Sequence, residues 1–250
     1  MKLRIITVTM NSEAFLADAL NSVKRQIIPA GLEIEHFIKD GLSSDCTADI
    51  VRIYASDVDY KVSFIQQSDS SIYDALNQSI SNEGADYFLF LHSDDVLYDK
   101  LVFVNLYGQM LSGADFIIGD LVYVSKEDTD NIIRRWCNPN YRHNLFIFGW
   151  MPAHPATIVK RKVFQDVGLF DVNLSISADY DWLLRALYLK SYNVKNVSNF
   201  IIRMRVGGIS SSGLKSEWLK LRQDISIARR HKLPIFSIVC KKMRKFAQFM

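Results

Sequence analysis

The sequence of 250 residues lacks several features that would point to a compartment or a class. It has only three cysteines, far apart and without a CxxC pair, which argues against a disulfide framework or zinc site and favours a reducing cytoplasm. The first residues do not resemble a secretory signal, and no stretch approaches the roughly 20 apolar residues that span a bilayer. Neither GxGxxG nor GxxxxGK[ST] occurs, so neither a dinucleotide site nor a P-loop is expected.

The net charge of +3 hides an asymmetry. Residues 215–250 hold ten Lys or Arg against two acids, a net charge of +8, which leaves −5 for residues 1–214. In this basic tail, apolar residues recur at helical spacing opposite a basic side: Ile235, Val239, Met243, Phe246 and Met250. The pattern predicts an amphipathic helix that lies on an anionic membrane surface; a helix packed on the domain or a partner contact is the alternative. The acidic remainder argues against nucleic acid as a partner.

Strand-like and helix-like segments alternate through the first half of the chain. The expected strands are 3–8, 34–38, 62–66, 87–91 and 116–118; the expected helices are 15–27 with Ser12 as the cap, 47–55, 72–81 and 101–111. Repeats of this spacing predict right-handed βαβ units and a doubly wound, mostly parallel α/β sheet. The alternation lapses after Gly119, and further helices are expected at 161–167 and 179–189. We expect one domain, residues 1–214, followed by a helical extension, residues 215–250.

One apolar segment ends directly in two adjacent carboxylates. Residues 87–91 have the length of a buried strand and lead through His92 and Ser93 to Asp94 and Asp95. Because an uncompensated carboxylate is costly to bury, we expect the pair at the exit of the strand, where open α/β sheets bind ligands. Adjacent acids there favour a hard cation that neutralises the phosphates of a nucleotide; a solvated turn is the alternative.

Polar side chains follow three more of the expected strands. Thr9 and Asn11 follow the first, Asp40 the second and Asp69 the third. The carboxyl ends of parallel strands lie at one edge of a sheet, so these successive polar ends predict a ligand cleft. Since phosphate-binding glycine loops are missing, we expect acidic groups to hydrogen-bond a base and ribose while a cation binds the diphosphate.

A series of short motifs accompanies these strand ends. In order they are IITVTMN (residues 5–11), KDGLSSD (39–45), SDSSIYDALN (68–77), HSDD (92–95), HPAT (154–157), VGLFD (167–171) and SADYD (177–181). In this order and spacing the sequence resembles the family 2 glycosyltransferases, which have the GT-A fold. It is similar in particular to the members that build bacterial surface polysaccharides, and the resemblance covers roughly residues 3–210.

The resemblance implies roles for the residues of the donor side. Asp40 would hydrogen-bond the base of a sugar nucleotide, with Thr9 and Asn11 beside it, and Asp69 would line the base and ribose pocket. Asp94 would contact the ribose or a metal-bound water. With Asp94 beside it, Asp95 would coordinate Mn²⁺ or Mg²⁺ at the diphosphate.

On the acceptor side, the resemblance implies that Asp179 is the base that deprotonates the acceptor hydroxyl. The sequence departs from the family pattern at Ser71, where Gly is usual, and at Ala178, where Glu is commoner. Asp181 competes with Asp179 as the base, but motif position favours Asp179. His154 either lines the acceptor cleft or is structural, and the Gly/Ser-rich residues 207–213 form either a connector or a lid over the donor.

The resemblance therefore implies an inverting, metal-dependent glycosyltransferase in the cytoplasm, peripheral on the inner face of the cell membrane. It would transfer a single sugar from a nucleoside diphosphate sugar, a UDP-sugar being favoured, to a saccharide or lipid-linked acceptor. Two alternatives stay open. A sugar-1-phosphate nucleotidyltransferase would need a Gly-rich basic loop after the first strand, which residues 9–13 lack. A non-catalytic subunit that binds nucleotide sugars is the second.

Overall fold

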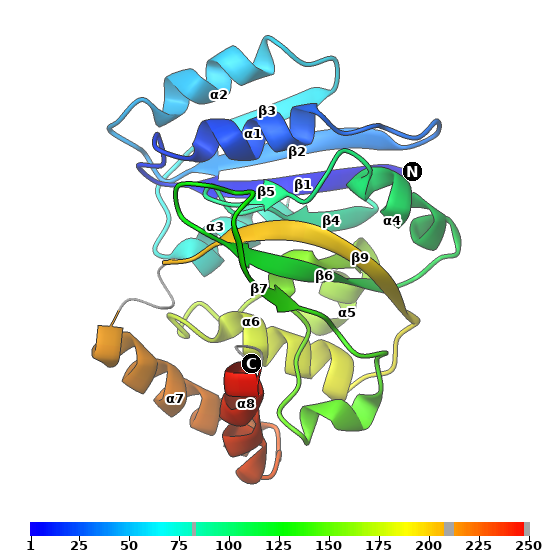
Figure 1. Cartoon of the computed structure of the whole chain (residues 1–250), viewed down its shortest axis with the longest axis vertical. Coiled ribbons are helices and arrows are strands. Elements are labelled where there is room, and N and C mark those ends of the chain that lie inside the picture. Colours follow the sequence, from blue (N-terminus) through cyan, green and yellow to red (C-terminus); the bar gives the residue numbers. More distant parts are fainter. Residues whose placement is uncertain (82–83, 208–212, 248–250) are drawn as a thin grey trace.

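The computed structural model describes residues 1–81, 84–207 and 213–247, and a nine-stranded sheet lies at its centre (Figure 1). The strand order is β3-β2-β1-β4-β8-β6-β9-β5, with β7 paired to β6. The strands are β1 (Lys2–Thr9), β2 (Glu33–Asp40), β3 (Lys61–Gln66), β4 (Tyr87–Phe90), β5 (Val96–Leu97), β6 (Phe116–Val124), β7 (Ile132–Trp136), β8 (Thr157–Lys160) and β9 (Val194–Arg205).

The first four strands form the parallel half of the sheet. β1 pairs with β2 and with β4, and β2 pairs with β3, all in parallel register. Helices follow the strands, as predicted: α1 (Leu16–Lys24), α2 (Thr47–Ala55), α3 (Ile72–Ser81) and α4 (Val102–Leu111). This arrangement brings the carboxyl ends of the four strands to one edge, on the left in Figure 1.

The expected start of the first helix was wrong. The helix begins at Leu16, with Phe15 as its N-cap, and Ile27 lies beyond its end with 46% of its surface exposed. The main-chain oxygen of Ser12 accepts hydrogen bonds from the Phe15 and Leu16 nitrogens in a turn, and its hydroxyl lies 3.1 Å from that of Ser93. The segment before Leu16 therefore belongs to the strand edge and not to the helix.

The second half of the sheet is mixed, and the one strand predicted there is longer than expected. β8 runs antiparallel to both β4 and β6, whereas β6 and β9 are parallel along most of their length. β6 extends to Val124, beyond the 116–118 expected, because its pairing with β7 and β9 continues past Gly119. The predicted helix at 161–167 is α5 (Arg161–Val167), and the predicted helix at 179–189 is α6 (Ala178–Leu183) followed by a π-helical turn (Leu184–Tyr188).

An aromatic cluster joins β4 to the helices beneath the sheet. Phe90 of β4 lies with its ring centroid 6.2 Å from that of Phe164 in α5 and 6.1 Å from that of Phe170. Trp182 of α6 stacks on Phe164 at 4.3 Å and is fully buried. The end of β4 and the start of α6 are thus built on one packed interior.

Two further buried groups lie near the amino-terminal half of the sheet. Glu35, 1% exposed in its side chain, accepts hydrogen bonds from the Arg4 guanidinium at 3.0 and 3.1 Å. His36 is fully buried on the neighbouring strand position, between the Thr7 and Tyr54 hydroxyls. Burial lowers the pKa of His36 to about 3.

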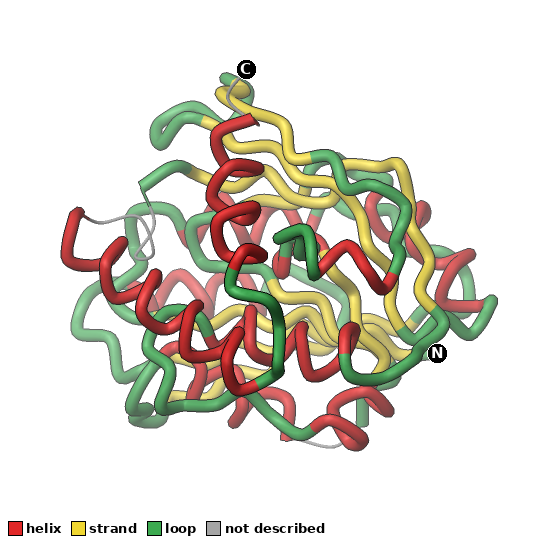
Figure 2. The backbone as a smooth tube through the Cα atoms, turned by 90° about the horizontal axis from the view of Figure 1, so that it is seen from below, coloured by secondary structure: helices red, strands yellow, loops and turns green. Residues whose placement is uncertain are grey.

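The basic tail forms two helices, α7 (Gly213–Arg230) and α8 (Phe236–Ala247), which lie below the sheet in Figure 1 and nearest the viewer in Figure 2. Ile227, Ala228, Leu233 and Ile238 belong to the same hydrophobic cluster as Phe90. The predicted helix in the tail is therefore present, and both helices share the main core. The side chain of Phe246, and Met250, lie outside the described part of the chain. No helix within that part is long and apolar enough to cross a bilayer.

Candidate active site

The polar strand ends predicted to converge do lie together. The Thr9 hydroxyl at the end of β1 donates to Asp40 Oδ1 at the end of β2, over 2.9 Å. Gly41 follows Asp40 directly, and a Cβ on it would lie 3.0 Å from Asp69 Oδ2 and 3.5 Å from the main-chain oxygen of Thr9. Only glycine leaves room for Asp69 to approach the loop this closely.

Asp40 is fully buried and its carboxylate is saturated with protein donors. Oδ1 accepts from the hydroxyls of Thr9 and Ser43, and Oδ2 accepts from the Ser43 nitrogen and from Gln66 Nε2. Burial raises the pKa of Asp40, but the hydrogen bonds from Ser43 and Gln66 outweigh it, so the pKa is lowered. Four hydrogen bonds use all the lone pairs of a carboxylate. The base of a nucleotide could therefore hydrogen-bond to Asp40 only by replacing one of them.

Asp69 is held by a buried lysine that the sequence reasoning did not single out. Lys39 Nζ donates to Asp69 Oδ2 over 3.1 Å, and the Lys39 side chain is 1% exposed. The same ammonium donates to the main-chain oxygens of Asp40 and Gln67. The available signal was a lysine directly after Phe37 and Ile38 at the end of a strand, since a buried ammonium needs acceptors on several sides.

Asn11 lies in the exposed loop after β1, in the left-handed backbone region with φ +49°. Its side-chain oxygen accepts from the Ser44 nitrogen at 3.0 Å, and its own nitrogen donates to the Ser43 hydroxyl at 2.8 Å. Asn11 therefore ties the loop after β1 to the loop after β2.

Asp95 is a buried carboxylate with one unused oxygen. It is 1% exposed, and its Oδ1 accepts from the Arg205 nitrogen at 3.0 Å. Oδ2 is buried and has no hydrogen-bond partner among the described residues. Burial and the neighbouring Asp94 charge raise the pKa of Asp95 well above its usual range. Its neighbour Asp94 is half-buried.

These two side chains fit a divalent cation. Hard cations prefer carboxylate oxygens, and a cation at Asp95 Oδ2 would supply a partner to a buried oxygen that has none among the described residues. The described residues contain no group of three or more His, Cys, Asp or Glu that could hold a metal ion. Further ligands would therefore come from water and substrate phosphates, as is usual for Mg²⁺.

Arg205 fastens this acidic pair to the end of β9. Its Nη1 donates to the Asp94 main-chain oxygen at 2.6 Å, and its Nη2 donates to Asp18 of α1 at 2.6 Å. The guanidinium also lies 4.7 Å from the centroid of the Phe15 ring, and the residue is 4% exposed. No local pattern distinguishes Arg205 in the sequence, because the acidic residues that it contacts are more than 100 residues away.

Asp179 lies in the first turn of α6, half-buried. Its Oδ1 accepts from the Tyr180 nitrogen at 2.8 Å. Burial raises the pKa of Asp179, while the charges of Lys241 and Lys220 lower it in part. Tyr73, from the SDSSIYDALN motif, donates its hydroxyl to the main-chain oxygen of Ile176 and so holds the segment that leads to Asp179.

Asp181, the competing candidate base, is engaged in a structural ion-pair network. It is 1% exposed and accepts from Arg185 Nε at 2.8 Å, while His231 Nε2 lies 2.8 Å from its other oxygen. Hydrogen bonds from His231 and Arg185 outweigh the effect of burial and lower the pKa of Asp181. Both oxygens are thus occupied, which leaves Asp179 as the better-placed base.

His92 lies near both the acidic pair and Asp179. Burial lowers the pKa of His92, and the charges of Asp94 and Asp179 both act to raise it. His154 stacks on Phe90 at 4.7 Å and is 6% exposed, and its Nε2 has no partner among the described residues. Burial, and then the neighbouring His92, lower the pKa of His154 to about 3. The two imidazoles are therefore neighbours, and the charges of Asp94 and Asp179 both reach His92.

Three other sequence observations have different outcomes. Ser71, where the family pattern has Gly, accepts from the Asp74 nitrogen at 3.2 Å and so caps α3. Trp150 and Trp182 are buried in the core. The lid hypothesis for residues 207–213 falls on residues 208–212, outside the described part of the chain.

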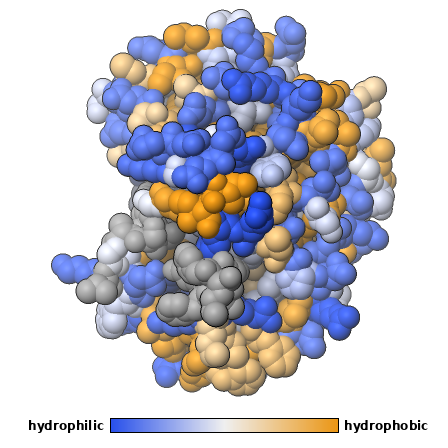
Figure 3. Space-filling view, viewed as in Figure 1, coloured by the Kyte–Doolittle hydropathy of each residue, from blue (hydrophilic) through white to orange (hydrophobic). Residues whose placement is uncertain are grey.

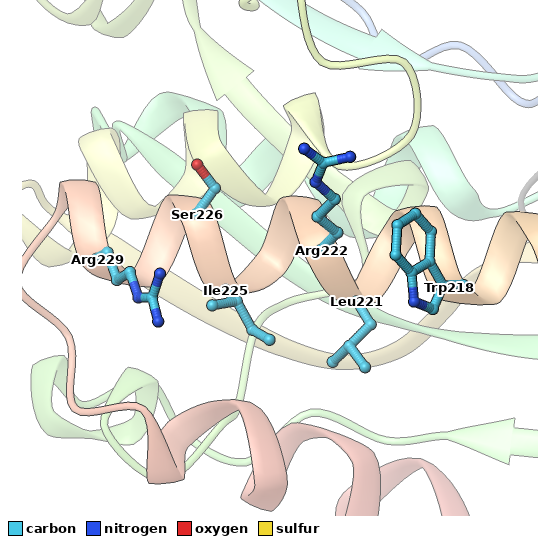
Figure 4. A pocket seen from close by; sticks show the side chains of 6 residues that line it. All are labelled: Trp218, Leu221, Arg222, Ile225, Ser226 and Arg229. Atoms are coloured by element: carbon cyan, nitrogen blue, oxygen red, sulfur yellow. The ribbon is translucent and has the colours of Figure 1, made fainter.

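A pocket of about 440 Å³ lies away from this edge, on α7 (Figure 4). Trp218, Leu221, Arg222, Ile225, Ser226 and Arg229 line it. The Arg222 guanidinium lies 5.7 Å from the centroid of the exposed Trp218 ring. Figure 4 shows that the six side chains form one stripe along the helix.

Comparison with known proteins gives one family. The sequence model of "Glycosyl transferase family 2" matches residues 4–168. A "PGL/p-HBAD biosynthesis glycosyltransferase" of Mycobacterium bovis is 26% identical over 219 residues, which cover 86% of this chain and 82% of that protein.

Two solved structures share the fold. Staphylococcus aureus TarS in complex with UDP-GlcNAc has a TM-score of 0.67 and 20% identity, covering 91% of this chain and 66% of that one. This chain spans only 43% of a longer TarS structure. A Pyrobaculum calidifontis mannosyltransferase in complex with GDP-Man and Mn²⁺ has a TM-score of 0.65 and 14% identity, covering 91% and 63%. The predicted α/β, GT-A fold is confirmed.

Proposed function

The chain belongs to glycosyl transferase family 2, and we propose that it is an inverting transferase for a single sugar. The donor would be a nucleoside diphosphate sugar, a UDP-sugar being favoured, and the acceptor a saccharide or lipid-linked oligosaccharide in surface polysaccharide synthesis. The observation that carries the proposal is that Asp94, beside the buried Asp95, and Asp179 both lie close enough to His92 for their charges to act on its imidazole. The TarS complex with UDP-GlcNAc supports a UDP donor.

The donor side is the edge formed by the ends of β1 to β4. Thr9, Asn11 and Asp40 shape the loops that would contact the base, and the Lys39–Asp69 pair borders the same loop beside Gly41. Asp94 and Asp95 would face the ribose and diphosphate. Mn²⁺ or Mg²⁺ held by Asp95 would neutralise the charge of the leaving diphosphate. The Mn²⁺ in the Pyrobaculum mannosyltransferase structure supports this choice.

Asp179 would carry out the proton transfer. The acceptor oxygen bonds to the anomeric carbon while the bond from that carbon to the diphosphate oxygen breaks, and the diphosphate leaves with the electron pair. The acceptor proton passes to the Asp179 carboxylate. One displacement inverts the anomeric centre, so a single base suffices and no covalent intermediate forms. The raised pKa of Asp179 brings it nearer to neutral pH, which improves it as a base.

A screen of nucleotide sugars against the purified protein, with Mn²⁺ present, tests this function. Release of the nucleoside diphosphate, with and without oligosaccharide acceptors, is the readout. Asp95→Asn should lose donor binding and transfer together. Asp179→Asn should keep donor binding and lose transfer by a factor of about 10² to 10⁴, the usual contribution of a general base.

Asp59→Asn is the matched control, because Asp59 lies in an exposed turn. It should retain full activity. A non-catalytic binding subunit would bind the donor yet transfer nothing as the wild type, and full transfer by Asp179→Asn would refute its role as the base.

The proposal also places the enzyme in the cytoplasm, on the inner face of the cell membrane. Four side chains of the C-terminal segment are at least half exposed although they are large and apolar: Ile235, Phe236, Val239 and Met243. Arg244 is exposed on the same helix, and Arg222 and Arg229 line the α7 pocket beside Trp218. Figure 3 shows apolar side chains at the lower end of this face, where α7 and α8 lie. Apolar area with a positive surround suits an anionic bilayer.

Flotation with phosphatidylglycerol-containing vesicles tests the membrane contact. Val239→Ser together with Met243→Ser should reduce bound protein, and pure phosphatidylcholine vesicles should bind less of the wild type. Ile53→Ser, an exposed apolar residue on α2, is the control and should bind like the wild type. Equal binding by all three proteins would contradict the membrane contact.

A further inference from the structure

The C-terminal helices contact the segment that carries Asp179. Gln223 Oε1 of α7 accepts hydrogen bonds from the main-chain nitrogens of Ile176 and Ser177, at 3.2 and 3.1 Å. Gln223 Nε2 donates to the Ser175 hydroxyl at 3.1 Å. The backbone directly before Asp179 is therefore fixed by a helix that the sequence assigns to the basic tail.

α8 brings a lysine to the same place. Lys241 Nζ donates to Asp224 Oδ2 of α7 at 2.9 Å and lies 3.4 Å from the centroid of the Tyr180 ring. Tyr180 is the residue after Asp179. Asp224 is 5% exposed and the Lys241 side chain 16%, so bulk water screens this charge little.

The backbone of α8 is seated closely enough to fix this position. A Cβ on Gly149 would lie 2.2 Å from the Lys241 nitrogen and 2.5 Å from the Ser237 main-chain oxygen. Arg244 Nε donates to the Phe148 main-chain oxygen at 3.0 Å. Together with the Asp224 contact, these leave Lys241 little freedom to move away from Tyr180.

We propose that α7 and α8 complete the active site and that Lys241 is a positioning residue for Asp179, held over Tyr180 by Asp224. This inference rests on the proposed function of Asp179 as the base. Lys241 acts through charge: it favours the ionised carboxylate, the form that accepts the acceptor proton. The catalytic unit then includes α7 and α8, and a protein cut at residue 214 would lack Lys241.

Several groups act on Asp179, and Lys241 is the main one that favours its charged form. Burial raises the pKa of Asp179; Lys241 lowers it most, followed by Lys220 of α7 and the Tyr180 nitrogen, and Asp224 raises it slightly. Tyr73 of α3 and His92 after β4 also face it. Removing the Lys241 charge should therefore leave Asp179 protonated at a higher pH.

The test compares Lys241→Met with Lys242→Met. Both remove one positive charge from α8, but Lys242 is exposed. Lys241→Met should move the acidic limb of the kcat/KM profile up by about one pH unit, with donor KM unchanged, since a nearby opposite charge shifts a carboxyl by about 1–3 units. Lys242→Met should keep the wild-type profile, and Lys241→Arg should restore most of it.

A second measurement is independent of turnover. NMR titration of the protein with ¹³C-labelled aspartate carboxyls gives the Asp179 pKa directly, the signal being assigned by its loss in Asp179→Asn. An unchanged Asp179 titration in Lys241→Met overturns the inference. If the titration shifts but the wild type transfers no sugar, the proposed function fails instead.

Lys241→Met leaves Asp224 buried without its partner. Should this variant melt early, Asp224→Asn with Lys241→Met removes both charges. Because Lys241 affects Asp179 more than Asp224 does, the Asp179 pKa should still rise, by less. No rise in the double variant also overturns the inference.

Discussion

Gly149→Ala should detach α8 from the domain without unfolding the sheet. Gly149 has φ +71°, and its Cβ would lie 2.2 Å from the Lys241 nitrogen, 2.5 Å from the Ser237 oxygen and 2.7 Å from the Cys240 carbonyl carbon. All three are main-chain atoms of one helix, so no side chain can rotate to make room. The helix has to move as a unit, by about 1 Å, to restore normal contact.

The magnitude has two parts. A non-glycine residue in the left-handed region costs roughly 1–2 kcal/mol. Overpacking a close-packed contact costs roughly 1–3 kcal/mol more. Gly113→Ala separates the two, because Gly113 has a similar φ of +76° and no heavy atom within 4 Å of its Cβ position. Gly113→Ala should lose only the stability that corresponds to the left-handed backbone.

Denaturant unfolding of both variants gives the free-energy difference, and hydrogen exchange locates it. In Gly149→Ala, amides of residues 236–247 should exchange faster while those of β1 to β4 stay protected. If the two variants lose equal stability, or if exchange in α8 is unchanged, then Gly149 does not seat the helix and the reasoning is refuted.

Three other outcomes follow from single sites. Gly108→Ala, on the exposed side of α4 with no atom within 4 Å, should stabilise the protein by about 0.5–1 kcal/mol in denaturant unfolding. Burial lowers the pKa of His36 to about 3, so the unfolded chain alone takes up this proton between pH 6.5 and 3. The contribution of His36 to the free energy of unfolding is therefore fully present above pH 6.5 and is lost on acidification, by at most about 5 kcal/mol. In His36→Gln, the melting temperature should depend less on pH over that range. Asp95→Asn should stabilise the free protein by on the order of 1 kcal/mol, seen as a higher melting temperature, because it removes a buried carboxylate whose Oδ2 has no hydrogen-bond partner among the described residues. Mn²⁺ with UDP should then stabilise the variant no further, and continued stabilisation would remove Asp95 from the cation site.

The parallel half of the fold was predictable because its signals are local. Each strand from β1 to β4 contains adjacent apolar residues and stops at a polar loop, and α2 and α3 begin and end where the periodicity indicates. Parallel pairing then fixes which strand ends meet. The convergence of Thr9, Asp40 and Asp69 follows from that topology without any knowledge of the side-chain contacts.

The mixed half was not predictable in the same way. β9 mixes buried, half-buried and exposed residues without a regular period over twelve positions, including Lys195 and Arg203, and is held by partners on both sides, β6 and β5. Its extent depends on those neighbours and not on its own composition.

The candidate site shows the same division. Its acids stand out in the sequence because they interrupt apolar segments, whereas the cations that pair with or act on them do not. Lys39 alone had a local signal, its position directly after Phe37 and Ile38 at the end of a strand. Arg205 is distant in sequence from the acids that it contacts, and Lys241 lies in the segment predicted to be a separate tail. Pairing across such separations is decided by the folded topology.

The aromatic cluster of Phe90, Phe164, Phe170 and Trp182 has a consequence for changing specificity. It joins β4, which leads to Asp94, to α6, whose first turn carries Asp179, and close-packed aromatic interiors deform little. The separation of the two reacting sides is thus set in the core. Loops at the rim, such as residues 41–46 and 68–71, can then be exchanged to accept another sugar or acceptor while the reacting groups stay in register. Substitutions in the aromatic cluster would change the separation of the reacting groups for every substrate at once.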